Sequence, residues 1–331
     1  MRRFLPIILG AVFSIGAVII LFSQVNFEEV IDNIRGANGL YLLIMGLVYP
    51  LSMVIRSVRW QHFLQAHLPF WRSFHITNIG YFFNAVLPFR LGEFARILLM
   101  SREPRHSAGA GLSALTLERL LDLSFALMCV GLGLALLPDN AALPAETTST
   151  LGILMVITII GGMVVIFLPR THPFILRILH IISRPLPDSL AHRGIKFVED
   201  TLNGLQIIAT PRRLFNTLIL TTITWSTYFA FFHVGLFAFL EKSPTLGVGF
   251  LVTGFVALGI AAPSLPGAIG VFQAAAVLAL TTAGYDTAIA TSYSWTLWVV
   301  EIGAIVLGGI WGLSAMGLSF GRLTREVTSQ H

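Results

Sequence analysis

The chain has 331 residues, of which 55% are hydrophobic and only 11% are charged, and its formal net charge is +5. Soluble domains carry about 25% charged residues, so this composition excludes an ordinary soluble protein. Apolar runs without charge, such as 5–23 and 151–169, are long enough to cross a hydrocarbon core of roughly 30 Å as helices. They do not alternate as the strands of a membrane β-barrel do, so we predict an all-α integral membrane protein.

The first predicted elements are two full helices. The helix over 5–23 follows two arginines, and because no small-residue cleavage site comes after it, we interpret it as a retained span rather than a signal peptide. An acidic connection leads to a second helix over 39–58, which ends in Arg56 and Arg59. Arginines and lysines gather at cytoplasmic helix ends. We therefore expect a multi-pass protein of the inner (cytoplasmic) membrane whose N- and C-termini are both cytoplasmic.

The next apolar stretch, 73–100, contains a polar and charged segment, NIGYFFNAVLPFRLGEFAR (78–96), which is costly in lipid. Pro88 divides the stretch into two pieces that are each too short to span the membrane. A full crossing would also place the basic loop 170–212 outside, against the orientation rule. We therefore expect a re-entrant hairpin that enters and leaves on the cytoplasmic side.

The rest of the chain predicts four more full helices, over 107–137, 151–169, 213–240 and 288–318. The loop 170–212 mixes apolar and charged residues at helical spacing, which is typical of helices on the membrane surface, although a solvated connecting helix fits equally well. Segment 246–284 is divided by APSLPGAIG into two uncharged pieces, a second hairpin. The prediction is one membrane domain, 1–331, with about six full transmembrane helices and two re-entrant or broken-helix hairpins.

The two broken segments resemble each other. LPFRLGEF (87–94) aligns with LPGAIGVF (265–272), and the same offset brings the flanking helices into register. The halves 1–140 and 150–320 would then form an inverted repeat, and a chance match between two breaks is the alternative. Paired broken helices hold the binding sites of many transporters. The residues that would break the helices are Pro88, Gly92, Pro263, Pro266, Gly267 and Gly270.

Charged side chains on and beside the first hairpin form the candidate substrate site. On a helix that begins near Pro88, Arg90, Glu93 and Arg96 would share roughly one face, and two guanidiniums near a helix N-terminus suit a phosphate. An internal ion pair that locks the hairpin is the alternative. The arginines at the end of helix 39–58 would contact lipid headgroups or serve only as interfacial anchors. The candidate substrate-binding residues are Asn84, Arg90, Glu93, Arg96, Arg56 and Arg59.

Four more charged residues lie within predicted spans. Glu118 and Asp122 share a face of helix 107–137, whereas Arg119 points about 100° away. The two carboxylates would either pair with arginines of the hairpin in a buried network or carry protons that drive transport. Glu301 has no basic neighbour in the sequence, so it either meets a membrane arginine or is protonated. We therefore take it as the stronger candidate for proton coupling.

The sequence motifs of several common enzyme classes are missing from the chain. It contains no phosphate-binding loop, zinc-protease motif or hydrolase nucleophile motif. The single cysteine, Cys129, cannot form an internal disulfide or a thiolate metal cluster. We expect no metal, no cofactor and no catalytic residue, and also no nucleic-acid partner, because the basic residues lie beside apolar spans where anionic lipid attracts them.

Four motifs carry a resemblance to a known family: RSVRW (56–60), NAVLPFRLGEFAR (84–96), ERLLD (118–122) and PSLPGAIGVFQ (263–273). At these residues the sequence resembles the flippase-like membrane domain family, the lysylphosphatidylglycerol synthase transmembrane region family. The resemblance implies lipid movement, since members with a fused soluble transferase domain use this part to move an aminoacylated phospholipid to the outer leaflet.

Stand-alone members are associated with lipid or lipid-linked sugar pathways, and the resemblance does not imply lysyl transfer here because no soluble domain follows. The second break commonly reads PGG, then a glycine and a nearby glutamate; Ala268 and Gln273 stand here instead. That departure puts any carboxylate function at the second hairpin in doubt.

Three functions remain open at this point. The first is a lipid translocase that moves an anionic phospholipid or a polyprenyl-linked intermediate between leaflets. The second is a membrane-embedded transferase acting on a lipid phosphate, with Glu93, Glu118 or Asp122 as general base. The third is a scaffold of a lipid-synthesis complex. A membrane lipid is the expected partner, and a homo-oligomer is compatible with each function.

Overall fold

The computed structural model is all-helical over the residues it describes. These are 27–64, 68–87, 90–137, 171–182, 188–206, 210–240, 243–261, 264–321 and 323–324, with a few positions between 149 and 160. The predicted helix 5–23, most of the predicted helix 151–169, and the break residues Pro88 and Pro263 lie outside this part of the chain. The all-helical prediction is confirmed for the described residues.

Four long helices form the frame of the molecule. They are α3 (Gly39–Leu64), α6 (Ala108–Ala135), α10 (Pro211–Phe239) and α13 (Thr287–Ala315). Three of them, α3, α10 and α13, are long and apolar enough to cross a membrane. The fourth, α6, has 28 residues and is therefore about 42 Å long, but it carries three charged residues near its middle. The bounds of α6, α10 and α13 agree with the predicted helices to within three residues, whereas α3 continues past the predicted end at 58 to Leu64.

Local sequence explains where the long helices begin. The Ser107 hydroxyl accepts a hydrogen bond from the Ala110 N–H at 3.2 Å at the start of α6. The Asp286 carboxylate accepts one from the Ala288 N–H at 2.7 Å at the start of α13. Side-chain acceptors of this kind satisfy N–H groups that have no partner within the helix. Pro211 occupies the first turn of α10, where its missing N–H costs nothing.

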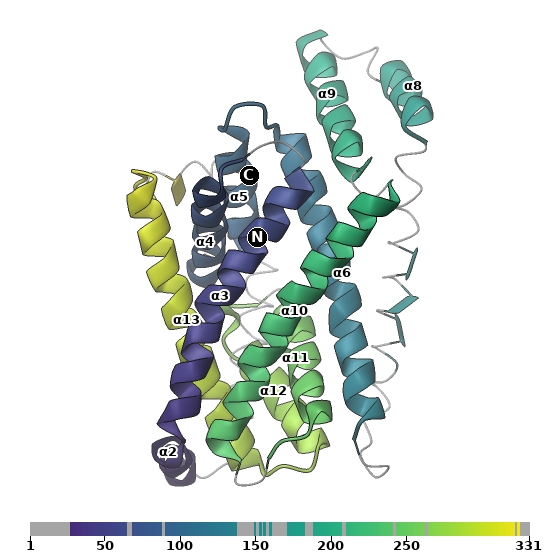
Figure 1. Ribbon diagram of the computed structural model, residues 1–331. Helices are drawn as coiled ribbons and strands as arrows, with labels where there is room; N and C mark the ends of the chain where they lie inside the picture. Colours follow the sequence, from purple (N-terminus) through teal and green to yellow (C-terminus); the bar gives the residue numbers. More distant parts are fainter. Residues whose placement is uncertain are drawn as a thin grey trace, which may run out of the picture.

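Two broken pairs of shorter helices lie inside the frame. The first pair is α4 (Phe70–Val86) and α5 (Leu91–Ser101); the second is α11 (Leu246–Ala261) and α12 (Val271–Thr282), with the short 3-10 helix η4 (Pro266–Ala268) between them. At 11 to 17 residues these helices are about 17–26 Å long, so each is shorter than the hydrocarbon core. In Figure 1, α4 and α5 occupy the upper part of the molecule, and α11 and α12 the lower part.

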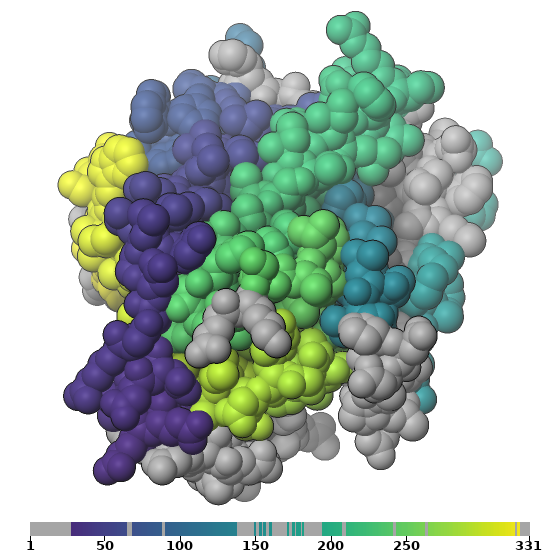
Figure 2. All heavy atoms as spheres, turned by 60° about the horizontal axis from the view of Figure 1, so that its bottom comes forward, coloured from purple at the N-terminus to yellow at the C-terminus, as the bar shows by residue number. Residues whose placement is uncertain are grey.

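The long helices enclose the broken pairs. Helix α3 packs along α10, α4 packs on α13, and α11 packs on α6. Figure 2 shows α3 and α10 side by side across one face. The contacts bury large aromatic rings, among them Phe231, Phe232 and Tyr293, and the Tyr293 hydroxyl donates to the Phe232 carbonyl at 2.9 Å. The apolar core is therefore shared between the two parts of the chain.

Three amphipathic helices lie at the two ends of the molecule. Helix α2 (Phe27–Gly36) replaces the connection expected before α3. Its glutamates lie in the first turn and its arginine in the last, which suits the helix dipole, and the buried Val30 packs it against α13. The loop 170–212 contains α8 (His172–Ile182) and α9 (Asp188–Leu205), and α9 packs on α6. In Figure 1, α8 and α9 lie at the end opposite α2.

Candidate functional site

The tip of the first broken pair is a tight turn in a strained backbone conformation. Arg90, directly before α5, has φ 54° and ψ 36°, which is the left-handed region that side chains with a Cβ rarely adopt. The Asn84 side-chain oxygen accepts a hydrogen bond from the Gly92 N–H at 2.9 Å and so ties the end of α4 to the start of α5. Gly92 also packs directly on the Gly80 carbonyl, and any side chain there would collide with it.

The tip of the second broken pair has a similar backbone. Ala268 has φ 53°, and the neighbouring Gly267 and Gly270 also have positive φ. The Gly270 N–H donates to the Gln273 side-chain oxygen at 2.7 Å, and the Trp298 indole donates to the Gly267 carbonyl at 2.7 Å. At each tip, therefore, a side-chain amide oxygen accepts a hydrogen bond from a glycine N–H: Asn84 from Gly92 at the first, and Gln273 from Gly270 at the second.

The two tips touch in the middle of the molecule. The Arg90 guanidinium donates to the Ile260 carbonyl at 2.5 Å, across 170 residues of sequence. Carbonyl groups at the end of α11 have no partner within the helix, so the cation satisfies a polar group that the break in the second pair leaves free. The candidate break residues Gly92, Gly267 and Gly270 lie at the two tips.

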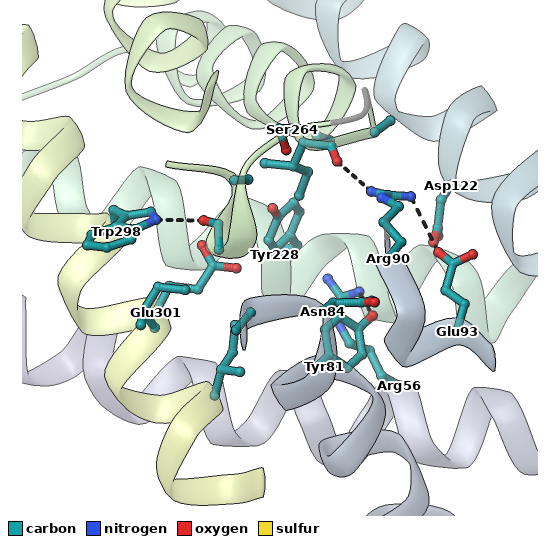
Figure 3. A pocket seen from close by; sticks show the side chains of 18 of the residues that line it. Arg56, Tyr81, Asn84, Arg90, Glu93, Asp122, Tyr228, Ser264, Trp298 and Glu301 are labelled. Atoms are coloured by element: carbon teal, nitrogen blue, oxygen red, sulfur yellow. Dashed lines mark hydrogen bonds and ion pairs between the residues drawn. The ribbon is translucent and has the colours of Figure 1, made fainter. Parts of the chain in front are cut away.

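A cavity of about 460 Å³ lies between the tips and the long helices. This volume falls in the range of about 300–1,000 Å³ that is usual for ligand sites. Both charged and aromatic side chains line it (Figure 3). The polar and aromatic residues of the wall are Tyr49, Arg56, Tyr81, Asn84, Arg90, Glu93, Arg119, Asp122, Trp225, Tyr228, Ser264, Trp298 and Glu301.

Three arginines contribute to this wall. The side chains of Arg90 and Arg119 are 31% and 35% exposed, so both are accessible from the cavity. Arg56 donates to the Tyr81 hydroxyl at 2.7 Å and lies over the rings of Tyr81 and Tyr228, 5.5 and 5.0 Å from their centroids. Stacked rings stabilise a cation without neutralising its charge, so the cavity keeps a positive character on this side.

A buried ion-pair cluster lies beside the cavity. Arg96 makes a two-pronged contact with Glu118, at 3.1 and 2.9 Å, and Arg59 bonds Asp122 at 2.8 Å. Arg119 donates to Glu118 at 2.9 Å and lies 3.5 Å from Glu93, so it connects the cluster to the cavity. The side chains of Arg59 and Arg96 are only 1% and 4% exposed, and the charge of each is paired with a carboxylate of α6.

The structure therefore divides the six candidate substrate residues into those that line the cavity and those that do not. Asn84, Arg90, Glu93 and Arg56 line the cavity, whereas Arg96 and Arg59 do not. The expectation that Arg90 and Arg96 share a helix face is wrong. Because Arg90 precedes α5 in a left-handed conformation, its side chain turns toward α11, while Arg96 points into the core and stacks on the Trp60 ring, 4.3 Å from its centroid.

The four other charged candidates have different surroundings. Glu118, Arg119 and Asp122 belong to the ion-pair cluster, with Glu118 bound to Arg96 and Asp122 to Arg59. Asp122 also accepts a hydrogen bond from the Trp225 indole at 3.1 Å. Glu301 lies on α13 in the cavity wall, on the opposite side from Arg90 in Figure 3. Within the described residues, no hydrogen bond or ion pair joins the Glu301 carboxylate to another group.

Several residues of the wall were missed by sequence reasoning. Tyr49 and Arg56 are seven residues apart on α3 and so share a helix face, a spacing that could have identified Tyr49. Arg119 was predicted only as a member of a buried network; it does bond Glu118, and it also lines the cavity. No sequence signal marks Tyr228 and Trp225, since α10 is rich in aromatic residues throughout.

The wall can bind an anion and can also exchange protons. Arginines hold phosphate groups through several hydrogen bonds, and Arg90 and Arg119 have accessible N–H groups. Carboxylates at Glu93, Asp122 and Glu301 line the same space, whereas Glu118 is enclosed by arginines and out of reach of a substrate. Among the described residues, no group of three histidine, cysteine or acidic side chains is arranged to bind a metal.

Comparison with known proteins places the chain among membrane proteins. A family model described as the lysylphosphatidylglycerol synthase TM region matches residues 7–309. The chain is also similar to the UPF0104 membrane protein PH1989 of Pyrococcus horikoshii, with 23% identity over 346 aligned residues that cover 94% of this chain and 96% of the relative. Because the family model covers nearly the whole sequence, this protein belongs to the lysylphosphatidylglycerol synthase transmembrane-region family, a membrane protein family linked to lipid handling.

Proposed function

We propose that the protein moves an anionic phospholipid or polyprenyl-linked lipid between membrane leaflets and that the headgroup binds in the cavity between the two tips. The observation that carries this proposal is the accessible pair Arg90 and Arg119, which line a cavity of about 460 Å³. Charged side chains inside an apolar helical bundle are costly, and they usually serve a function. A phosphate group fits this volume, whereas acyl chains would have to remain in the surrounding lipid.

The two broken pairs fit an inverted repeat of re-entrant hairpins. The packing of α4 on α13 is matched by that of α11 on α6, and α3 packs along α10. The left-handed residues Arg90 and Ala268, with φ 54° and 53°, stand at equivalent places in the aligned motifs. On this arrangement α8 and α9 lie on the cytoplasmic side of the inner membrane, with the first hairpin and both termini. Movement of one repeat against the other would then expose the cavity to each leaflet in turn.

Arg96 and Arg59 have a different function in this proposal from the one expected from sequence. Their guanidiniums are held by Glu118 and Asp122, so they fix α3 and α5 to α6 and keep Arg119 in place. Arg56 adds positive charge to the cavity wall from α3. The substrate-binding residues that we propose are therefore Arg90, Arg119 and Arg56.

Reconstituted protein tests the proposal. Purified protein in liposomes should equilibrate fluorescent phosphatidylglycerol between leaflets, measured as the fraction of label that dithionite quenches. Arg90→Gln should weaken headgroup binding about 10- to 100-fold, because a hydrogen bond from a charged donor contributes about 1.5–3 kcal/mol. Arg90→Lys should retain part of the activity. Arg35→Gln, a control at an exposed arginine of α2, should leave transport unchanged.

Two results would contradict this proposal. One is wild-type protein that moves neither phospholipid nor polyprenyl lipid. The other is full transport by Arg90→Gln. Because Arg90 also contacts Ile260, elution of each variant as a folded, single species must accompany the assay.

Membrane-embedded transfer to or from a lipid phosphate is the second candidate. One observation favours it: the Glu93 and Asp122 carboxylates line the cavity that would hold the phosphate. Mass spectrometry of the lipids after the same incubation distinguishes the two. A lipid of changed mass supports a transferase, and unchanged lipid that has crossed the membrane supports a translocase.

A further inference from the structure

One carboxylate of the cavity stands apart from the ion-pair cluster. Glu301 lies in the wall formed by α13, and Figure 3 shows it across the cavity from Arg90. In the described part of the chain, no basic nitrogen lies within 4.0 Å of its oxygens. A charged carboxylate in a membrane interior without such a partner is costly, so this group needs a cation from elsewhere.

The helices packed against α13 supply one cation, Arg56, whose charge acts on Glu301 from beyond 4.0 Å. The titratable side chains that face the same cavity are Tyr49 and Arg56 from α3, Tyr81 from α4 and Tyr228 from α10; the described residues of α2 and α12 contribute none. The Arg56 guanidinium is bonded to the Tyr81 hydroxyl and enclosed by two rings. The buried Tyr228 hydroxyl has no hydrogen-bond partner among the described residues, so the wall beside Glu301 has unused polar groups.

The charge balance of the interior links Glu301 to an anion. Within the described interior, the arginines at 56, 59, 90, 96 and 119 exceed the carboxylates at 93, 118, 122 and 301 by one. This excess of one positive charge attracts a phosphate monoanion, which would then share the cavity with the negative charge of Glu301. A sphere of the cavity's volume is only about 10 Å across, and at that separation and an effective dielectric of about 20 a second negative charge lowers anion affinity roughly tenfold.

We propose that Glu301 takes up a proton when an anionic headgroup enters the cavity, so that lipid and proton occupy it together. The proton comes from water and forms an O–H bond on the carboxylate; it returns to water when the headgroup leaves. This inference rests on the proposed function and adds to it a coupling ion and an energy source, a transmembrane proton gradient.

Proton counting during lipid binding tests the inference without requiring transport. Protein in a non-ionic detergent, weakly buffered near neutral pH with a pH indicator, is titrated with short-chain phosphatidylglycerol, while calorimetry measures binding. Wild-type protein should take up as much as about half a proton for each lipid bound, which is the most that a tenfold difference in affinity between the two protonation states allows. Glu301→Gln should take up none and bind about tenfold more tightly. Glu29→Gln, a matched control on the exposed surface of α2, should behave as wild type.

Each result decides the inference. Lipid binding without proton uptake overturns it, as does uptake that persists in Glu301→Gln. Binding that depends on sodium rather than choline as the buffer cation, with no proton uptake, also overturns it. A wild type that binds no anionic lipid contradicts the proposed function and the inference together. If Glu301→Gln does not fold, the proton count of the wild type alone decides.

Discussion

The substitution Glu118→Gln tests the assignment of the buried cluster as a structural element. The Glu118 carboxylate accepts two hydrogen bonds from Arg96 and one from Arg119, all within 3.1 Å, and lies 3.8 Å from Arg59. The neutral amide keeps the shape of the side chain but removes its charge, and it presents N–H donors to guanidiniums that cannot accept a hydrogen bond.

The expected loss follows from burial. Both Glu118 and Arg96 are almost inaccessible to solvent, and removal of one partner from a buried ion pair costs about 3–5 kcal/mol. Glu93→Gln is the matched control, because Glu93 is more exposed and its pairs are longer, at 3.4 and 3.5 Å. For these longer and less buried contacts we expect a smaller loss than at Glu118.

Unfolding in mixed micelles, with increasing SDS and helix content followed by circular dichroism, measures both variants. Glu118→Gln should unfold at a clearly lower SDS fraction than wild type, with Glu93→Gln close to wild type. Equal stability of the two variants would refute the reasoning, because it would mean that the charges of the cluster do not fix α5 to α6.

Two further predictions concern the tips. Gly92→Ala should prevent folding, because its Cβ would collide with the Gly80 carbonyl and lie 2.6 Å from the Asn84 oxygen. The control is Gly303→Ala, whose Cβ meets nothing within 4 Å and which should elute from size exclusion like wild type. Ala268→Gly should stabilise the second tip by about 1 kcal/mol in the same SDS titration, because glycine adopts the left-handed conformation of φ 53° without a steric penalty. If Ala268→Gly is no more stable than wild type, the backbone at the second tip is not strained.

The helical frame could be predicted because each long helix is an apolar run, and three of the four also have a start signal. Ser107, Asp286 and Pro211 stand at or next to the first residue of α6, α13 and α10. The breaks in 73–100 and 246–284 were also visible, since proline and glycine interrupt an apolar run. Helix α2 was missed because it is short and partly polar, and it is held by tertiary contact of Val30 with α13.

The site could be predicted only as a set of residues. The sequence identified the charged groups, but their pairing depends on long-range packing: Arg59 meets Asp122 across 63 residues. Helical spacing misplaced Arg90, because one left-handed residue before α5 redirects its side chain. By contrast, the absence of a basic residue near Glu301 in the sequence could be recognised without knowing the fold.

The most direct test of the account is a structure of the protein in a lipid nanodisc that contains phosphatidylglycerol. We expect density for a phosphate group in the cavity, within hydrogen-bond distance of the Arg90 guanidinium and close to Arg119, with acyl chains leaving toward the surrounding lipid. A cavity that holds only water or an acyl chain at saturating anionic lipid would contradict the claim that Arg90 and Arg119 recognise a lipid headgroup.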